Sequence, residues 1–230
     1  MAKPKHLSWT EGAGVPENWL TAFQALVWIL ELQKGQDVMI HAGASGVGVA
    51  ANQLARFYGA NRVFSTVSSP EKIAFLKSMG AFAPTHPISY KTQDFEAEVK
   101  RATNGAGVDA IVDFVGRDYW EKNIGALALD GRMVILGLLS GGELSNASLV
   151  PILRKRLRVQ GSTLRVRSTE YQQDLITQFS KEVLDQVKGQ SSPDGLKVYI
   201  HKVYSWREVG QAHEEMAANK NLGKIVLTID

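Results

Sequence analysis

The stretch HAGASGVGVAANQLAR, residues 41–56, decides the predicted fold. It begins at the end of a short apolar run, Asp37–His41, which is typical of a buried strand that stops at glycines. From Val47 to Tyr58 apolar residues recur at helical spacing, and Gly59 closes the pattern. The stretch is therefore predicted to be a glycine-rich turn between a buried strand and a helix.

This turn has the spacing of a phosphate-binding loop, Gly43-x-Ser45-x-x-Gly48, with serine in place of the usual middle glycine. Gly43 permits a tight turn, and Gly48 permits close packing of helix on strand. Gly46 and Val47 place free amides at the helix N-terminus, where the helix dipole favours an anion. The alternative is a loop of small residues without a ligand. The flanking strand and helix favour nucleotide binding.

Strands and helices alternate along the following 80 or so residues, and the connections are short. Strands are predicted at 62–67, 81–83, 108–115 and 131–137, and helices at 70–79, 94–102 and 119–129. Short connections between parallel strands require right-handed crossovers, so the sequence predicts a doubly wound parallel α/β sheet of the Rossmann type. Further elements are predicted as a helix at 168–188, a strand at 196–203, a helix at 205–219 and a strand at 224–228.

The chain is accordingly divided into a linker (1–18), a dinucleotide-binding domain (19–167) and a C-terminal part (168–230). The second turn, Ser68-Ser69-Pro70-Glu71-Lys72, indicates which nucleotide is bound. An NAD-binding domain usually places an Asp or Glu on the ribose diol at this point. Neutral hydroxyls and Lys72 favour the 2′-phosphate of NADPH, with NADH as the alternative. Glu71 is consistent with a helix N-terminus, and Ser69 is also a normal N-cap.

Composition excludes several classes of protein. The 230 residues include no cysteine, which excludes disulfides and thiolate zinc sites, and the five histidines lack metal-site spacing. The apolar run Trp19–Leu32 is too short to span a bilayer, and the N-terminus has no secretory core, so a cytoplasmic protein without a membrane segment is predicted. The basic residues Arg154, Lys155, Arg156, Arg158, Arg165 and Arg167 raise RNA binding as an alternative. Without interleaved aromatics they fit a solvated face or a subunit interface better.

Several motifs together resemble one family. HAGASGVG, SSPEK, VDFVG, ALDGR and ANKNLGKIVL are similar to motifs of the zinc-independent quinone oxidoreductases (zeta-crystallin-like NADPH:quinone reductases) of the medium-chain dehydrogenase/reductase family. The likeness runs from about Leu7 to the C-terminus. It implies hydride transfer from NADPH to a quinone or similar electron-poor acceptor, without a metal. The family pattern A-x-x-G-x-x-G falls on Ala42, Ser45 and Gly48, and close relatives also carry the serine.

The resemblance also implies where NADPH is held. Ala44, Ser45, Gly46 and Val47 would contact the pyrophosphate, Ser69 and Lys72 the 2′-phosphate, and Tyr90 the adenosine side. Gly116, Gly137 and Leu138 would lie along the cofactor, with Leu164, Arg165, Val166 and Asn219 near the nicotinamide. The Ser45 hydroxyl would point at the cofactor or the acceptor. No catalytic acid or base is assigned.

The chain departs from the family in one large respect. Family members begin with a GroES-like domain that forms much of the quinone pocket, and this chain starts near the linker that follows it. The region from Tyr199 to Asp230, which returns to that domain in family members, is expected to expose an apolar face. The resemblance further implies a homodimer through an edge strand at Val159–Arg165. The alternative to a reductase is an NADPH-binding module with little turnover.

Overall fold

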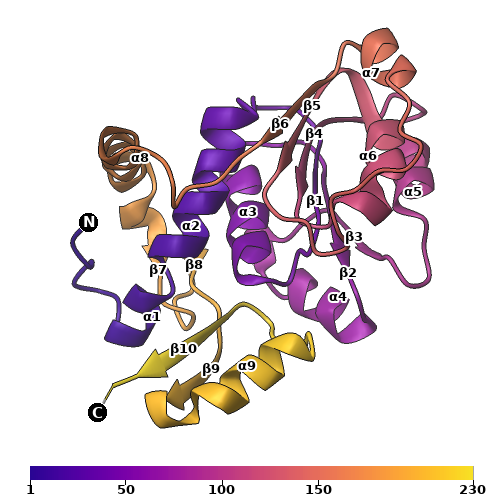
Figure 1. Cartoon of the computed structure of the whole chain (residues 1–230). Helices are drawn as coiled ribbons and strands as arrows, with labels where there is room; N and C mark the ends of the chain where they lie inside the picture. Colours follow the sequence, from indigo (N-terminus) through magenta and orange to yellow (C-terminus); the bar gives the residue numbers. More distant parts are fainter. Residues whose placement is uncertain (230) are drawn as a thin grey trace.

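A six-stranded parallel sheet forms the centre of the molecule, of which the computed structural model describes residues 1–229 (Figure 1). The strands lie in the order β3-β2-β1-β4-β5-β6. β2 and β3 therefore lie on one side of β1, and β4, β5 and β6 lie on the other. This order is that of the dinucleotide-binding α/β fold, which confirms the predicted fold class. The strands are β1 (Val38–Ile40), β2 (Val63–Val67), β3 (His86–Ser89), β4 (Val108–Asp113), β5 (Leu127–Ile135) and β6 (Arg158–Gly161).

Helices cover both faces of this sheet, because successive side chains of a strand point to opposite faces. Val38 and Ile40 of β1 join one buried cluster, and Met39 between them joins the other. The first cluster packs under α2 (Pro16–Phe23), its π-helical continuation η1 (Gln24–Ile29), α3 (Gly46–Phe57) and α8 (Thr169–Glu182). The second packs under α5 (Phe95–Ala102), α6 (Trp120–Ala126) and α7 (Val150–Lys155). Within residues 1–229, no helix has the length and apolar character needed to cross a membrane.

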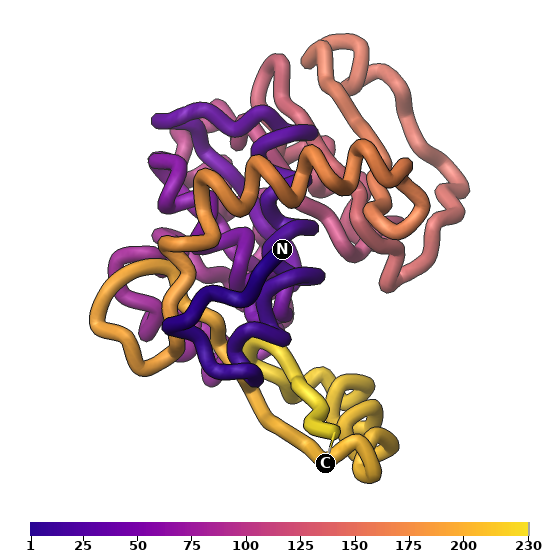
Figure 2. Tube along the Cα trace, turned by 90° about the vertical axis from the view of Figure 1, so that its left-hand side faces the viewer, coloured from indigo at the N-terminus to yellow at the C-terminus, as the bar shows by residue number. Residues whose placement is uncertain are grey.

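Residues 200–228 form a strand–helix–strand unit that projects from the body of the molecule (Figure 2). Its parallel strands β9 (Ile200–Ser205) and β10 (Lys224–Thr228) pair with each other and flank α9 (Val209–Ala217). A second small parallel pair precedes it, β7 (Val187–Lys188) and β8 (Leu196–Lys197). The remaining elements are α1 (Trp9–Ala13), α4 (Pro70–Lys77) and the 3-10 turns η2 (Gly80–Phe82), η3 (Arg117–Tyr119), η4 (Leu184–Gln186) and η5 (Trp206–Glu208).

The predicted strand Ala81–Ala83 is wrong. Gly80–Phe82 forms a 3-10 turn, and the third strand lies further along, at His86–Ser89. Pro87 lies within this run, and proline lacks the N–H that a strand in the interior of a sheet needs. Because β3 is the edge strand of the sheet, it pairs with β2 alone and tolerates a residue without an N–H.

Other predicted boundaries also move. The helix predicted at 168–188 ends at Glu182, and the strand predicted at 196–203 is two strands that belong to different sheets. The helix predicted at 119–129 stops at Ala126, since Leu127 already pairs with Val108 in the central sheet. Asp230, the last residue of the predicted C-terminal part, lies outside the described residues.

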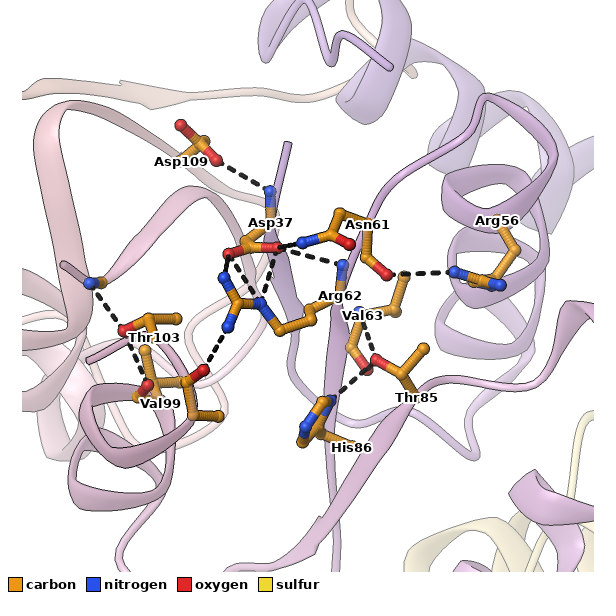
Figure 3. A network of polar contacts seen from close by, with 12 residues as sticks. Asp37, Arg56, Asn61, Arg62, Val63, Thr85, His86, Val99, Thr103 and Asp109 are labelled. Atoms are coloured by element: carbon orange, nitrogen blue, oxygen red, sulfur yellow. Dashed lines mark hydrogen bonds and ion pairs between the residues drawn. The ribbon is translucent and has the colours of Figure 1, made fainter. Parts of the chain in front are cut away.

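A polar network joins neighbouring strands at the start of β1 (Figure 3). The Asp37 carboxylate, 9% exposed, forms an ion pair with Arg62 at 2.8 Å and accepts hydrogen bonds from the Asn61 amide and the Arg62 backbone. Asp109 accepts from the Asp37 backbone N–H at 2.7 Å. Each partner is satisfied, as a buried charge requires. The network links the starts of β1, β2 and β4, at the amino ends of the strands and so away from the turn after β1.

Candidate functional site

In the turn after β1, a larger residue at Gly43 or Gly48 would force neighbouring atoms to shift. A Cβ on Gly43 would lie 1.9 Å from the Ser65 Oγ, and one on Gly48 would lie 2.2 Å from the Ala42 carbonyl oxygen. Ala42 itself has a φ of 48°, a strained conformation for a residue with a side chain. The turn therefore brings the start of α3 tightly against β1 and β2.

Ser45 begins α3 as its N-cap. Its hydroxyl accepts a hydrogen bond from the Gly48 N–H at 3.1 Å and keeps its own O–H as a donor, so its contact with the cofactor or the acceptor stays a prediction. Gly46 and Val47 are the first two residues of α3, and their amides have no acceptor within the helix. Both residues border a pocket, where these amides and the helix dipole favour an anion.

Two adjoining pockets lie beside this turn, at the carboxyl ends of the strands where open α/β sheets bind ligands. The first has a volume of about 610 Å³ and the second of about 300 Å³, and both are bordered by Ala42, Ser45, Leu139 and Met216. The other residues around the first pocket are Ala44, Thr66, Val67, Ser68, Lys72, Tyr90, Val115, Asp118, Tyr119, Ser140, Ala217 and Asn219. The residues around the two pockets come from the carboxyl ends of β1, β2, β4 and β5 and from α9.

Lys72 is the cation of the first pocket. Its side chain is largely buried, and Nζ donates hydrogen bonds to the backbone and side-chain oxygens of Asn219, each at 2.8 Å. Burial lowers the pKa of Lys72. The third N–H of the ammonium has no acceptor among the described residues. Asp118 is the only carboxylate among the described residues around this pocket, and Glu71 is exposed on α4.

Of the remaining residues predicted to contact the cofactor, Tyr90 and Gly137 border one of the two pockets, whereas Ser69 and Gly116 border neither. Tyr90 borders the first pocket with Tyr119, their ring centroids 6.2 Å apart, and Gly137 borders the second. Ser69 is not among the residues that border the first pocket; it caps α4, and its hydroxyl accepts a hydrogen bond from the Lys72 N–H at 3.3 Å. Gly116 packs against the following loop, since a Cβ there would lie 2.7 Å from the Gly141 carbonyl oxygen.

The residues predicted to lie near the nicotinamide are not brought together. Leu164 packs against the first buried cluster. Leu138, which was predicted to lie along the cofactor, borders a third pocket at the ends of β5 and β6. Arg165 and Val166 are exposed and border neither of the first two pockets. Asn219 lies at Lys72, the residue predicted for the opposite end of the cofactor, because the turn after α9 lies over the second turn of the sheet.

The second pocket contains polar residues that sequence analysis missed: Glu17, Asn18, Asn221 and Lys224. Lys224 Nζ donates to the Glu17 carboxylate at 2.7 Å and to Asn18 Oδ1 at 3.3 Å. Asn18 is 4% exposed and fills the space beside Gly46, where a Cβ would lie 2.5 Å from its Nδ2. No sequence signal joins residues some 200 positions apart. The chain joins them in space because the Gly223 N–H donates to the Ala44 carbonyl oxygen at 2.8 Å.

A buried histidine lies beneath the first pocket. His41 is fully buried, with Nδ1 2.9 Å from the Thr66 hydroxyl and Nε2 2.7 Å from Asn123 Oδ1. Burial lowers the pKa of His41 to about 4, so the ring is neutral near pH 7. Thr66 borders the first pocket, and His41 thereby supports its floor.

The basic segment is largely engaged within the chain. Lys155 Nζ donates to the carbonyl oxygens of Ile124, Gly125 and Leu127 at 2.7–2.9 Å, which satisfies the C-terminal end of α6. Arg156 forms a bidentate pair with Asp130, and Arg158 pairs with Glu31. Three of the six basic residues considered for RNA binding therefore already have partners within the chain. Among residues 1–229, no three His, Cys, Asp or Glu side chains gather as metal ligands would.

Comparison with known proteins decides the family. The model of the zinc-binding dehydrogenase family matches residues 46–181, more than half of the chain, from the start of α3 to the end of α8. The chain belongs to the zinc-binding dehydrogenase family. Its fold is the NAD(P)-binding fold of the medium-chain dehydrogenase/reductase type.

Solved structures superpose over the whole chain or nearly all of it. An NAD-dependent alcohol dehydrogenase is 32% identical with a TM-score of 0.81, covering 100% of this chain and 62% of its own. The CurK enoyl reductase is 33% identical with a TM-score of 0.79, covering 100% of this chain and 65% of its own. A quinone oxidoreductase of Pseudomonas syringae is 26% identical with a TM-score of 0.79, covering 97% and 66%.

Curated relatives of this zinc-binding dehydrogenase domain include much larger proteins. A highly reducing polyketide synthase of Arthrinium phaeospermum is 30% identical over 99% of this chain, which corresponds to 9% of the synthase. The chain thus spans about two thirds of the solved structures it resembles and a small part of such synthases.

Proposed function

We propose that this chain binds NADPH and holds it for hydride transfer to a quinone or a similar electron-poor acceptor. One observation carries the proposal. The glycine turn and the α3 amides open onto two adjoining pockets, and the buried cation Lys72 borders the first of them. A dinucleotide needs such an extended site, with an anion-binding turn at its middle and a cation for a 2′-phosphate at one end.

The residues present fit NADPH. The closeness of Gly43 and Gly48 to backbone and side-chain atoms forces α3 to begin right beside β1, which directs the amides of Gly46 and Val47 to the pockets. Lys72 has a free N–H for a phosphate oxygen, and the second turn brings no carboxylate to the first pocket to repel it. Tyr90 and Tyr119 offer aromatic surface for the adenine.

When bound, NADPH would supply the hydride, and the protein's part would be to bind it, align it and exclude water. The turn after β1 would hold the pyrophosphate, and Lys72 would hold the 2′-phosphate. A quinone accepts a hydride without a strong general acid or a Lewis acid, so the proposed reaction assigns no role to zinc.

A second candidate acceptor is an enoyl thioester. The likeness to the CurK enoyl reductase and to reducing polyketide synthases favours it. Like a quinone, a conjugated enoyl group is an electron-poor acceptor of a hydride. The same cofactor site serves both reactions, so the acceptor alone separates the two candidates.

The test is oxidation of NADPH by the full chain, followed at the absorbance of the reduced nicotinamide, with a naphthoquinone or with crotonyl thioester as the acceptor. Quinone-dependent oxidation that exceeds the thioester-dependent rate supports the proposal, and the reverse order favours the enoyl reductase. Tight NADPH binding without oxidation by either acceptor contradicts a reductase role for this chain and supports the binding module.

A further inference from the structure

We infer that Asn219 is a specificity-determining residue of the nucleotide site: it positions the Lys72 ammonium for the 2′-phosphate, and its neutral side chain does not cancel the charge of that ammonium. The inference rests on the proposed function for the identity of the ligand. It adds a second residue, in the turn after α9, to the selection of NADPH over NADH. The chemical group selected is a phosphate on the ribose rather than a free hydroxyl.

The contacts of Lys72 provide the first argument. Its Nζ donates to the backbone oxygen and to the side-chain Oδ1 of Asn219, each at 2.8 Å, and both residues border the first pocket. An ammonium has three donors, and Asn219 fixes the direction of two of them. The third donor has no acceptor among residues 1–229, so Asn219 determines where it points. Because the ammonium is held before the ligand arrives, less rotational freedom is lost on binding.

The backbone of Asn219 provides the second argument. Its φ of 53° lies in the left-handed region, which asparagine, aspartate and glycine adopt most readily. Of these three residue types, glycine has no side chain to accept a hydrogen bond from Lys72, and aspartate would add a negative charge. Asparagine therefore supplies both acceptors without altering the charge of the pocket.

The turn that carries Asn219 is held in place by contacts that do not involve the lysine. The Gly223 N–H donates to the Ala44 carbonyl oxygen at 2.8 Å, and the Leu222 N–H donates to His201 Nδ1 at 3.2 Å. The first contact ties this turn to the turn after β1, and the second ties it to β9. Asn219 thus sets the position of the ammonium rather than following it.

The charges around the first pocket provide the third argument. Lys72 is the only cation among the described residues that border it, and Asp118, the only carboxylate, forms an ion pair with Arg117 at 3.0 Å. Glu71 is exposed and lies outside the pocket. A neutral partner therefore leaves Lys72 free to bind a phosphate. A carboxylate at position 219 would pair with the ammonium, repel the phosphate and accept from a ribose hydroxyl, as the acidic residue of NAD-binding domains does.

The test is equilibrium binding of NADPH and of NADH to the full chain, followed by nucleotide fluorescence. The quantity compared is the ratio of the two dissociation constants, which a general loss of folded protein would not change. Asn219→Asp keeps the shape of the side chain and adds a charge, so it should lower the preference for NADPH at least about tenfold, with NADH binding unchanged or tighter. Asn219→Gly keeps the left-handed turn and the backbone acceptor and removes Oδ1, so it should lower the preference about threefold to tenfold.

Two controls separate this role from a general effect. Ala218→Asp adds the same charge at the exposed neighbouring position, which borders neither of the first two pockets, and should leave the preference within about threefold. In a Lys72→Met background, Asn219→Gly should change the preference by less than about twofold, because the amide acts through the ammonium. Thermal unfolding shows that each variant is folded.

Four outcomes would overturn the inference and leave the proposed function standing. They are the same preference in the wild type and Asn219→Asp, equal weakening of both nucleotides by Asn219→Asp, a loss of preference in Ala218→Asp as large as in Asn219→Asp, and a full effect of Asn219→Gly in the Lys72→Met background. Failure of the wild type to bind NADPH, or equal affinity for the two nucleotides, would overturn the proposed function and the inference together.

Discussion

Lys72 and Asn219 are joined by two hydrogen bonds of 2.8 Å, from one ammonium to the backbone and side-chain oxygens of the same residue. Asn219 has a φ of 53°, the left-handed conformation that its position in the turn after α9 imposes. The contact connects the second turn of the sheet to the C-terminal strand–helix–strand unit. That unit therefore borders both pockets, and the backbone contact between Gly223 and Ala44 ties it to the turn after β1.

Lys72→Met should weaken NADPH binding about tenfold to a hundredfold and leave NADH binding within about threefold, because it removes a charged partner of the 2′-phosphate alone. Dissociation constants from nucleotide fluorescence test this. Lys77→Met, at the exposed end of the same helix, is the control and should change neither constant. Equal losses for the two nucleotides would mean that Lys72 does not select NADPH.

Gly48→Ala should destabilise the chain by about 1–3 kcal/mol and weaken NADPH binding, because the new Cβ meets the Ala42 carbonyl oxygen and pushes α3 away from β1. Gly210→Ala in α9 is the matched control. A Cβ at Gly210 meets no atom within 4 Å, so this variant should be as stable as the wild type or slightly more so. Urea unfolding and NADPH titration of both variants measure the difference, and a Gly48→Ala chain that behaves like Gly210→Ala would contradict the tight-turn account.

The sequence predicted the parts of this site that depend on neighbouring residues, and it missed contacts between segments far apart in the chain. The turn at Gly43–Gly48 and the α4 N-cap Ser69 follow from local rules of backbone conformation, and both formed where predicted. The contact between Asn18 and Lys224 was not predicted, because it depends on how α2 and β10 pack and no local sequence pattern indicates that packing. Ser45 borders both pockets and also caps α3 through the Gly48 N–H, so its predicted ligand contact stays a prediction. Strand β3 escaped because only its edge position makes Pro87 acceptable.

His41 should make the stability of the fold depend on pH. Its pKa is lowered by burial to about 4 in the folded chain from an ordinary value of 6.5, so the unfolded chain binds the proton more readily. The stabilisation is present above pH 6.5 and is lost as the pH falls towards 4, with a full size of roughly 3 kcal/mol. Comparing the free energy of unfolding of the wild type and His41→Gln across this range isolates the effect. If the difference between the two proteins is constant with pH, His41 is not the titrating group.

We propose that β6 mediates a homodimer. It pairs with β5 on one side only, which leaves an unpaired edge at Arg158–Gly161 that overlaps the predicted edge strand Val159–Arg165. Light scattering at micromolar concentration should give the mass of two chains. Gln160→Lys, at an exposed position of this edge, should shift the chain towards the monomer because two like charges would meet near the two-fold axis. A monomeric wild type would remove the proposal.

The central claim, that the two pockets beside the turn form an NADPH site, is tested most directly by titrating the wild-type chain with NADPH and with NADH under identical conditions. We expect saturable binding of NADPH with an affinity at least about tenfold higher than that of NADH, because of the charged contact of the 2′-phosphate with Lys72. No saturable binding of NADPH, or equal affinity for the two nucleotides, would contradict it.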